Sequence, residues 1–315
     1  MASGAFGTAN NVTTTSAATF IPEIWSDEIV AAYEKKLVMA NLVKRMSMKG
    51  KKGDTVHIPV PVRGTAAAKA ANTAVTIQYN TEQEVAVSIN KHYEYSRLIE
   101  DIVSKQALAS LRQFYTSEAG YALARQKDTD LVLLGRSSNN GAGTAAYANA
   151  YIGGDGSTAY NSGTPNASAL TDAGIRRMIQ RLDDNDAPME DRVLVVPPSS
   201  RNTLMGISRF TEQAFVGEVG NGNTIRNGKI GDVYGVEVFV TPNCDTATGA
   251  ARIALLFHKD AAVLVEQMGV RAQTQYKQEY LGDLFTADTL YGVQLLRKGD
   301  LAAAPATMFP IAVPA

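Results

Sequence analysis

The most constraining feature of this sequence is a strand pattern that prolines interrupt. In residues 54–62, DTVHIPVPV, apolar residues recur at every second position, which is the period of a β-strand with one buried face. Pro59 and Pro61 lack the N–H that a ladder needs, so this strand cannot lie in the middle of a sheet. A second alternating run follows at 84–90. Together they predict a long β-hairpin, too thin to have a core of its own. The residues expected on its apolar face are Val56, Ile58, Val60, Val62, Val85, Val87 and Ile89.

Helical patterns flank this hairpin. Before it, a small polar stretch predicts an extended arm, and the stripe of Ile29, Tyr33 and Leu37 predicts a short amphipathic helix. After it, residues from about 104 to 134 predict a helix in which only Gly120 interrupts good helix formers. At about 1.5 Å per residue, such a helix would be a rod about 45 Å long.

The second half of the chain has an α/β pattern. A Gly/Ser/Asn/Ala-rich surface insertion at 135–168 comes first. The predicted elements are then a helix at 171–182, a strand at 192–196, a helix at 199–207 capped by Ser199 or Ser200, a glycine-rich loop at 217–231, strands at 235–240, 252–257 and 289–297, and an apolar segment at 261–270. The tail, apolar with three prolines, is expected to pack along the body.

Charge and composition exclude several classes of protein. The 315 residues include 30 Lys+Arg and 31 Asp+Glu, a balance unlike that of a protein that coats nucleic acid. A single cysteine, Cys244, excludes an intramolecular disulfide. There is no signal-peptide pattern and no apolar run long enough to span a membrane, so we expect no membrane partner.

The chemical motifs are weak. Gly222, Gly228 and Lys229 approach a phosphate loop, but the glycine spacing is one residue too long and Ile230 stands where Ser or Thr is needed. The three histidines are scattered and lack metal-ligand spacing. An acidic cluster is better explained as a helix end and a solvated turn than as a calcium site; it comprises Asp183, Asp184, Asp186, Glu190 and Asp191. We therefore expect no enzyme, no catalytic residue, no cofactor site and no metal site.

The remaining information is architectural. An arm and a projecting hairpin are segments that bind by lying along another surface, which favours a self-assembling lattice protein. The order of segments resembles the major capsid proteins of tailed bacteriophages, the Hong Kong 97-type fold. The segments that carry this resemblance are FIPEIWSDEIVAAYEKKLVMANLV before KKGDTVHIPV, SKQALASLRQFYTSEAGYALARQKDTDLVLL, RVLVVPPSSRNTLMG followed by KIGDVYGVEVFVTPN, and YGVQLLRKGDLAAA.

The resemblance implies an α+β phage major capsid fold with a defined division. The implied parts are an N-terminal arm and short helix at 1–53, an extended β-hairpin loop at 54–95, the peripheral-domain spine helix at 96–135, a surface insertion at 136–168, an axial α/β domain at 169–258, peripheral-domain strands at 259–300 and a C-terminal tail at 301–315 that packs on the body.

It also implies roles for particular residues. The apolar hairpin residues and Lys69 would lie over an adjacent subunit, and Gly120 would be the bend of the spine helix during shell expansion. Small residues at the capsomer axis would be Gly217, Gly220 and Gly222, and the arm would include Phe20, Ile21, Trp25, Ile29 and Tyr33. Some family members cross-link a loop lysine to a neighbour's asparagine, but no matching asparagine or carboxylate accompanies Lys69.

The implied partners are mainly copies of the chain itself, in hexamers and pentamers of a closed icosahedral shell in the virion. Because no leader precedes the arm, a separate scaffolding protein is implied, with a portal protein and a decoration protein as further partners. The shell would assemble in the host bacterial cytoplasm, mature from a procapsid and enclose double-stranded DNA without reading its sequence.

Three alternatives remain at this point. An encapsulin-type nanocompartment would share the fold but hold protein cargo. A small-molecule enzyme on the α/β half would need clustered titratable residues around a pocket, which the sequence does not show. A tail or decoration protein of the same virus is disfavoured by the long helix.

Overall fold

The computed structural model describes residues 37–61, 64–75, 77, 83–101, 110–136, 152–157, 167–207, 232–244, 251–297 and 307–314. Its helices are α1 (Met39–Leu42), α3 (Ser110–Arg136), α5 (Asp172–Asp184), α6 (Pro198–Met205) and the 3-10 turn η4 (Lys259–Ala261). Its strands are β1 (Lys44–Ser47), β2 (Thr55–Val60), β3 (Gln83–Ser88), β4 (Lys91–Glu100), β5 (Ile152–Gly153), β6 (Arg192–Val196), β7 (Asp232–Val233), β8 (Val236–Val240), β9 (Ala251–His258), β10 (Ala262–Lys277), β11 (Gly282–Leu295) and β12 (Met308–Pro314).

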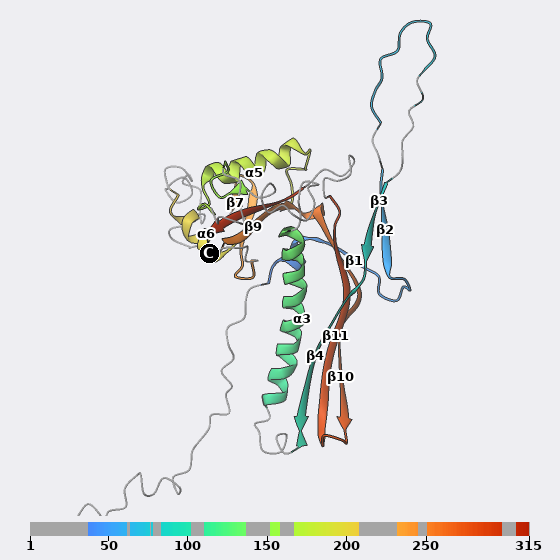
Figure 1. The fold of residues 1–315 in the computed structure, drawn as a ribbon, viewed down its shortest axis with the longest axis vertical. Coiled ribbons are helices and arrows are strands. Elements are labelled where there is room, and N and C mark those ends of the chain that lie inside the picture. Colours follow the sequence, from blue (N-terminus) through green and yellow to red (C-terminus); the bar gives the residue numbers. More distant parts are fainter. Residues whose placement is uncertain are drawn as a thin grey trace, which may run out of the picture.

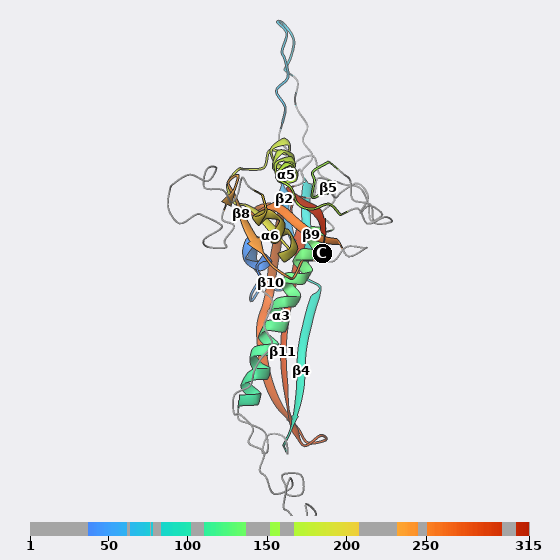
Figure 2. The ribbon, with the colours of Figure 1, turned by 90° about the vertical axis from the view of Figure 1, so that its left-hand side faces the viewer.

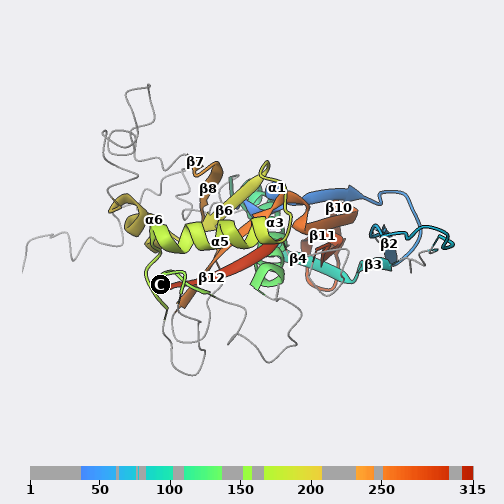
Figure 3. The same ribbon diagram turned by 90° about the horizontal axis from the view of Figure 1, so that it is seen from above.

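One half of the molecule is built on a six-stranded sheet. Its order is β5-β12-β9-β6-β8-β7, with β6 parallel to β8 and antiparallel to β9. Every residue of β6 is buried, because side chains on both faces of the sheet are covered. Helices α5 and α6 cover one face, as seen from above in Figure 3, and α3 approaches the other.

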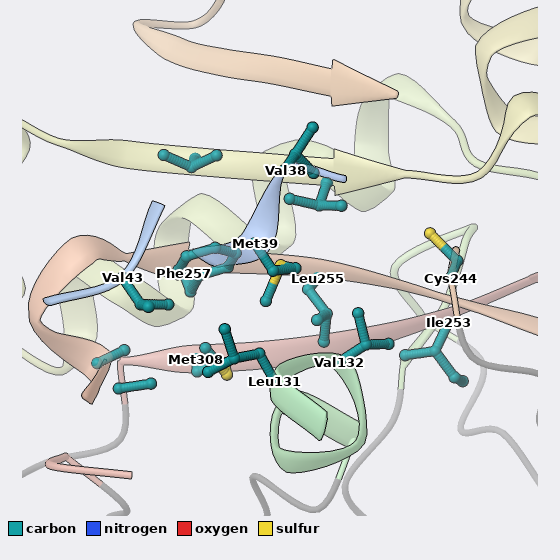
Figure 4. Close-up of a cluster of buried hydrophobic side chains, with 14 of the residues drawn as sticks. Val38, Met39, Val43, Leu131, Val132, Cys244, Ile253, Leu255, Phe257 and Met308 are labelled. Atoms are coloured by element: carbon teal, nitrogen blue, oxygen red, sulfur yellow. The ribbon is translucent and has the colours of Figure 1, made fainter. Parts of the chain in front are cut away.

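Alternating residues of the same strands pack in two different cores, one on each face of the sheet. Val193 and Val195 of β6 face the α3 side, whereas Leu194 and Val196 face α5. Figure 4 shows the α3-side core, where Leu131 and Val132 of the helix meet the sheet. Helix α5 begins as the sequence predicts, because Thr171 is its N-cap and accepts a hydrogen bond from the Gly174 N–H at 3.2 Å.

The other half is an elongated four-stranded sheet of order β1-β10-β11-β4. Strands β10 and β11 have 16 and 14 residues and extend far from the six-stranded sheet (Figure 1). Helix α3 lies along one face of these strands in both side views (Figures 1 and 2). Ala119 and Leu123 of the helix pack there against Phe285 and Ala287 of β11.

The hairpin is a separate two-stranded sheet in which β2 pairs with β3 antiparallel. Val56 lies opposite Val87, and Ile58 lies opposite Val85. The strand pattern with its prolines therefore forms the predicted hairpin, and Figure 1 shows it projecting from the body.

Four expectations need correction. Strand β4 covers Lys91–Glu100 and belongs to the four-stranded sheet, so the hairpin loop does not extend to 95 and the long helix does not begin at 96. Neither Ser199 nor Ser200 caps α6, whose N-cap is Pro197; the Ser199 hydroxyl instead donates to the carbonyl of Pro314 at 2.8 Å. The tail does pack on the body, but it does so as β12, a full strand paired with β9 along its length.

Candidate functional site

The root of the hairpin packs on its own subunit. Val87 is 0% exposed, and it shares a small apolar cluster with Ile89 and with Val263 and Val265 of β10. Val56 and Ile58 of β2 pack against the same cluster. This changes the expectation for the hairpin's apolar face, because side chains buried at its root are not available to a neighbouring subunit.

The distal part of the hairpin is exposed. Residues 64–75 have no regular secondary structure apart from a turn, in which Asn72 has a positive φ of 62° and the Thr73 hydroxyl donates to Ala70 O at 2.7 Å. Val75 is 71% exposed and Ile77 is 86% exposed. Large apolar side chains that protrude this far from a body are typical of contact sites for another surface.

A second exposed apolar group lies at the far end of the four-stranded sheet. Tyr280 and Leu281, in the turn between β10 and β11, are 63% and 64% exposed. The turn is fixed in place, because the Asp101 N–H donates to Leu281 O at 2.9 Å and the Tyr276 hydroxyl donates to Asp101 Oδ2 at 2.9 Å. The molecule thus presents apolar groups on two projections, the hairpin and this turn.

Beyond the hairpin root, the face of the four-stranded sheet opposite α3 is polar. Asp288 of β11 accepts two hydrogen bonds from Arg271, at 3.1 and 2.9 Å, and lies 3.2 Å from His92 Nε2. The bonds from Arg271 are the main reason that the pKa of the Asp288 carboxyl is below its ordinary value, and His92 adds to the effect. The group borders a hollow of about 370 Å³ that Glu94 and Thr286 also line.

This polar group does not have the features of a catalytic centre. The Asp288 carboxylate is held in its charged form by a paired arginine, so it is not placed to exchange protons near neutral pH. Among the described residues, no group of three His, Cys, Asp or Glu side chains could hold a metal ion. Cys244 is buried and donates to Thr241 O at 3.4 Å. The group of Arg271, Asp288 and His92 is therefore a structural clamp that joins the neighbouring strands β10, β11 and β4.

Apart from Val56, Ile58, Val60, Val85, Val87 and Ile89, which lie in or beside the hairpin strands, the residues expected at functional positions fall into two sets. Lys69 is exposed in the distal loop of the hairpin, and Gly120 lies inside α3 with open space around its α-carbon. The others lie outside the described residues: Val62, Phe20, Ile21, Trp25, Ile29, Tyr33, Gly217, Gly220 and Gly222. Sequence reasoning missed Tyr280 and Leu281; Gly282, which follows them, is a local signal of a turn but does not show that the turn projects.

Among the described helices, none has the length and apolar character needed to cross a membrane. The sequence profile of a family described as phage capsid protein matches residues 93–296, which is most of the chain. The chain belongs to this family. The match spans most of β4 and every described element from α3 to β11, whereas α1, β1, the hairpin and β12 lie outside it.

Solved capsid chains share the fold. A chain from Mycobacterium phage Che8 is 24% identical, with a TM-score of 0.72 and coverage of 93% of this chain and 97% of that one. The capsid of cyanophage P-SCSP1u is 16% identical, with a TM-score of 0.71 and coverage of 97% and 95%. The capsid of cyanophage Pam1 is 13% identical, with a TM-score of 0.70 and coverage of 100% and 99%. No curated protein matches the sequence.

These findings confirm the predicted fold class and the family. The protein functions as a major capsid protein of tailed phages, which is a structural and not an enzymatic role. Its copies form the capsomers of the virion shell. The family match favours this function over the nanocompartment, the small-molecule enzyme and the tail or decoration protein.

Proposed function

We propose that the distal hairpin loop and the β10–β11 turn are the principal contacts between copies of this chain in a closed icosahedral shell of hexamers and pentamers. The observation that carries this proposal is the exposure of Val75, Ile77, Tyr280 and Leu281 on projections far from either core. Contacts of this kind need not be strong one by one, because a closed shell makes many of them act together.

The root of the hairpin supports this proposal in a second way. Because Val87 and Ile89 anchor β3 on the body, the distal loop is presented from a fixed base. A presented loop loses less conformational entropy on binding than a free segment does. The small residues of 64–71, which include Ala66, Ala67 and Ala68, would let the loop lie close to a neighbour's backbone.

Further partners are proposed from the resemblance. A separate scaffolding protein would guide assembly in the host cytoplasm, a portal protein would occupy one vertex, and a decoration protein would bind the outer surface. The nearly equal numbers of basic and acidic residues, 30 and 31, suit a shell that encloses double-stranded DNA without binding its sequence.

Other expectations also stay proposals. Gly120 would bend α3 when the procapsid expands, and Gly217, Gly220 and Gly222 would lie near the capsomer axis. Covalent cross-linking through Lys69 is not part of the proposal, because no matching partner residue is identified. Boiled mature particles should therefore run as a single band near the subunit mass of 33.6 kDa.

The proposal is tested by assembly of variants co-expressed with the scaffold. The double variant Val75→Ser, Ile77→Ser should remain a folded subunit and give few or no closed particles by sedimentation and negative-stain microscopy. Met189→Ser is the matched control, because Met189 is 76% exposed in a turn that lies on neither projection. Normal particle yield from the double variant would contradict the role of the hairpin loop, and nucleic acid inside the particles distinguishes a phage shell from a protein-filled compartment.

A further inference from the structure

One turn of α3 carries three buried charged side chains. Lys127, Asp128 and Asp130 are 8%, 0% and 5% exposed, and the next residues, Leu131 and Val132, belong to the apolar core. A charge removed from water is costly unless ion pairs or hydrogen bonds compensate it. Each of these three groups must therefore find partners on another element.

Lys127 and Asp130 find theirs on the four-stranded sheet. The Lys127 ammonium donates to Glu266 Oε1 of β10 at 2.8 Å and lies 5.4 Å from the centre of the Tyr291 ring. Asp130 Oδ2 accepts from the Tyr291 hydroxyl at 2.7 Å and lies 3.1 Å from the Lys91 ammonium of β4. Burial, together with the bond to Asp130, raises the pKa of the Tyr291 phenol, so this hydroxyl stays a donor.

Asp128 reaches in other directions. Its Oδ1 accepts from the backbone N–H groups of Val38 and Met39, at 3.1 and 2.7 Å, at the start of α1. Its Oδ2 accepts from the side-chain amide of Asn243 at 2.8 Å, in the turn that follows β8 of the six-stranded sheet. One carboxylate thus joins α3, the start of α1 and the turn that follows β8 of the six-stranded sheet.

The bonding of Asp128 makes these contacts depend on one another. Within the described chain, no lysine, arginine or histidine forms an ion pair with Asp128, so three neutral N–H donors compensate a fully buried charge. If residues 38–39 moved away, the carboxylate would keep one donor of three. If the Asn243 turn moved away, the remaining donors would have to compensate the charge without it.

We infer that Asp128 is a coupling residue, through which the seating of residues 38–39 and the position of the 241–244 turn against α3 depend on each other. Apolar packing runs in parallel, since Val38 and Met39 lie in the same core as Leu131 and Val132 (Figure 4). A displacement of residues 38–39 is thereby transmitted to the joint between the long helix and the six-stranded sheet. This inference does not depend on the proposed contact surfaces.

The first test is amide hydrogen exchange of the full-length protein with Asp128→Asn. Exchange of the amides of residues 38–39 and of the 241–244 turn should rise together, each by about tenfold or more, because a charged acceptor of three bonds becomes a neutral one. Asp130→Asn is the matched control on the same helical turn. It should raise exchange near Lys91 and Tyr291 and leave residues 38–39 protected.

A second variant separates coupling from a local effect and serves also if Asp128→Asn does not fold. Asn243→Ala removes the side-chain bonds from the 241–244 turn to Asp128 and Thr129 of α3 and leaves the Val38 and Met39 donors in place, and it should still raise exchange at residues 38–39 by several-fold. Unchanged exchange there would overturn the inference and leave Asp128 as a local cap of α1. An equal rise at residues 38–39 in Asp130→Asn would also overturn it, because the effect would then be general loosening of α3.

Discussion

The six-stranded sheet is covered on both faces, whereas the four-stranded sheet is covered by α3 on one face. Its other face is covered by the hairpin root only at the end near Val263 and Val265, and it carries polar side chains beyond that end. The contrast is clearest between two strands, because every residue of β6 is buried and no residue of β4 is. The second half of β10 is also exposed. The first sheet resembles the centre of a globular domain, and the second resembles a platform whose distal part has a free face.

This difference assigns different tasks to the two sheets. Burying a large apolar side chain contributes about 1.5–3 kcal/mol, whereas an exposed ion pair contributes about 0–1 kcal/mol. The six-stranded sheet should therefore dominate the stability of the subunit. The four-stranded sheet, held by strand pairing and polar clamps such as Arg271–Asp288, can present its free face without a comparable loss.

The largest expected effect comes from truncating matched phenylalanines in the two sheets. Phe257 of β9 is 0% exposed inside a large core, and Phe285 of β11 is 8% exposed in a cluster that contains three other buried residues in the described part of the chain. Phe257→Ala should lower the free energy of unfolding by about 3–5 kcal/mol, and Phe285→Ala by at least about 1 kcal/mol less. Urea unfolding of unassembled subunits measures both, and equal losses would contradict the contrast.

Alanine substitution of two helical glycines should change the stability of the subunit in opposite directions. A Cβ at Gly174 of α5 would overlap the carbonyl oxygen of Gly154, whereas a Cβ at Gly120 of α3 would meet nothing within 4 Å. Gly174→Ala should cost about 1–3 kcal/mol through overpacking. Gly120→Ala should gain about 0.5–1 kcal/mol from helix propensity. Thermal unfolding midpoints give the two signs, and a loss in Gly120→Ala would show that α3 needs its flexibility even in the free subunit.

The polar clamp of the four-stranded sheet should contribute less and depend on pH. Asp288→Asn should cost about 1 kcal/mol at neutral pH, because its partner Arg271 is 54% exposed. The folded-state pKa of Asp288 is lowered, so its contribution is fully present above the ordinary carboxyl pKa of about 3.9 and is lost as the pH falls through the lowered value. Glu94→Gln, in the same hollow, is the control. Urea midpoints that differ equally at neutral and strongly acidic pH would contradict this assignment.

The smallest effect on the subunit is expected at the tip of the hairpin. Ile77→Ser should change the free energy of unfolding by no more than about 0.5 kcal/mol, because Ile77 is 86% exposed. Its effect should appear in assembly alone. A loss above about 1 kcal/mol in the unassembled subunit would mean that the tip packs on its own body.

Much of the fold could be predicted because its signals are local. The alternation of 54–62 with its prolines predicted the hairpin, and the apolar run of 192–196 predicted a strand, which the structure shows to be buried. The helix predicted at 171–182 is α5, which Thr171 caps. Each of these patterns reports which face of one element is apolar, and the residues concerned are neighbours in the chain.

The buried charged residues of α3 and their partners could not be predicted in the same way. In sequence, Lys127, Asp128 and Asp130 look like the solvated face of a helix, since charged residues are seldom buried. Their partners Glu266 and Asn243 lie more than a hundred positions away in the chain. The exposed turn at Tyr280 was missed for a related reason, because only the pairing of β10 with β11 shows how far it projects.

By itself, the sequence determined the elements, the apolar faces of the hairpin and the order of segments that resembles a phage capsid protein. Periodicity and proline chemistry act over a few residues, so they can be read without a structure. Only the tertiary structure decided that Val87 turns inward to its own body while Ile77 faces outward, and that the Asp128 carboxylate meets Val38, Met39 and Asn243. Those outcomes depend on contacts between distant segments, because burial belongs to the packed chain and not to the residue type.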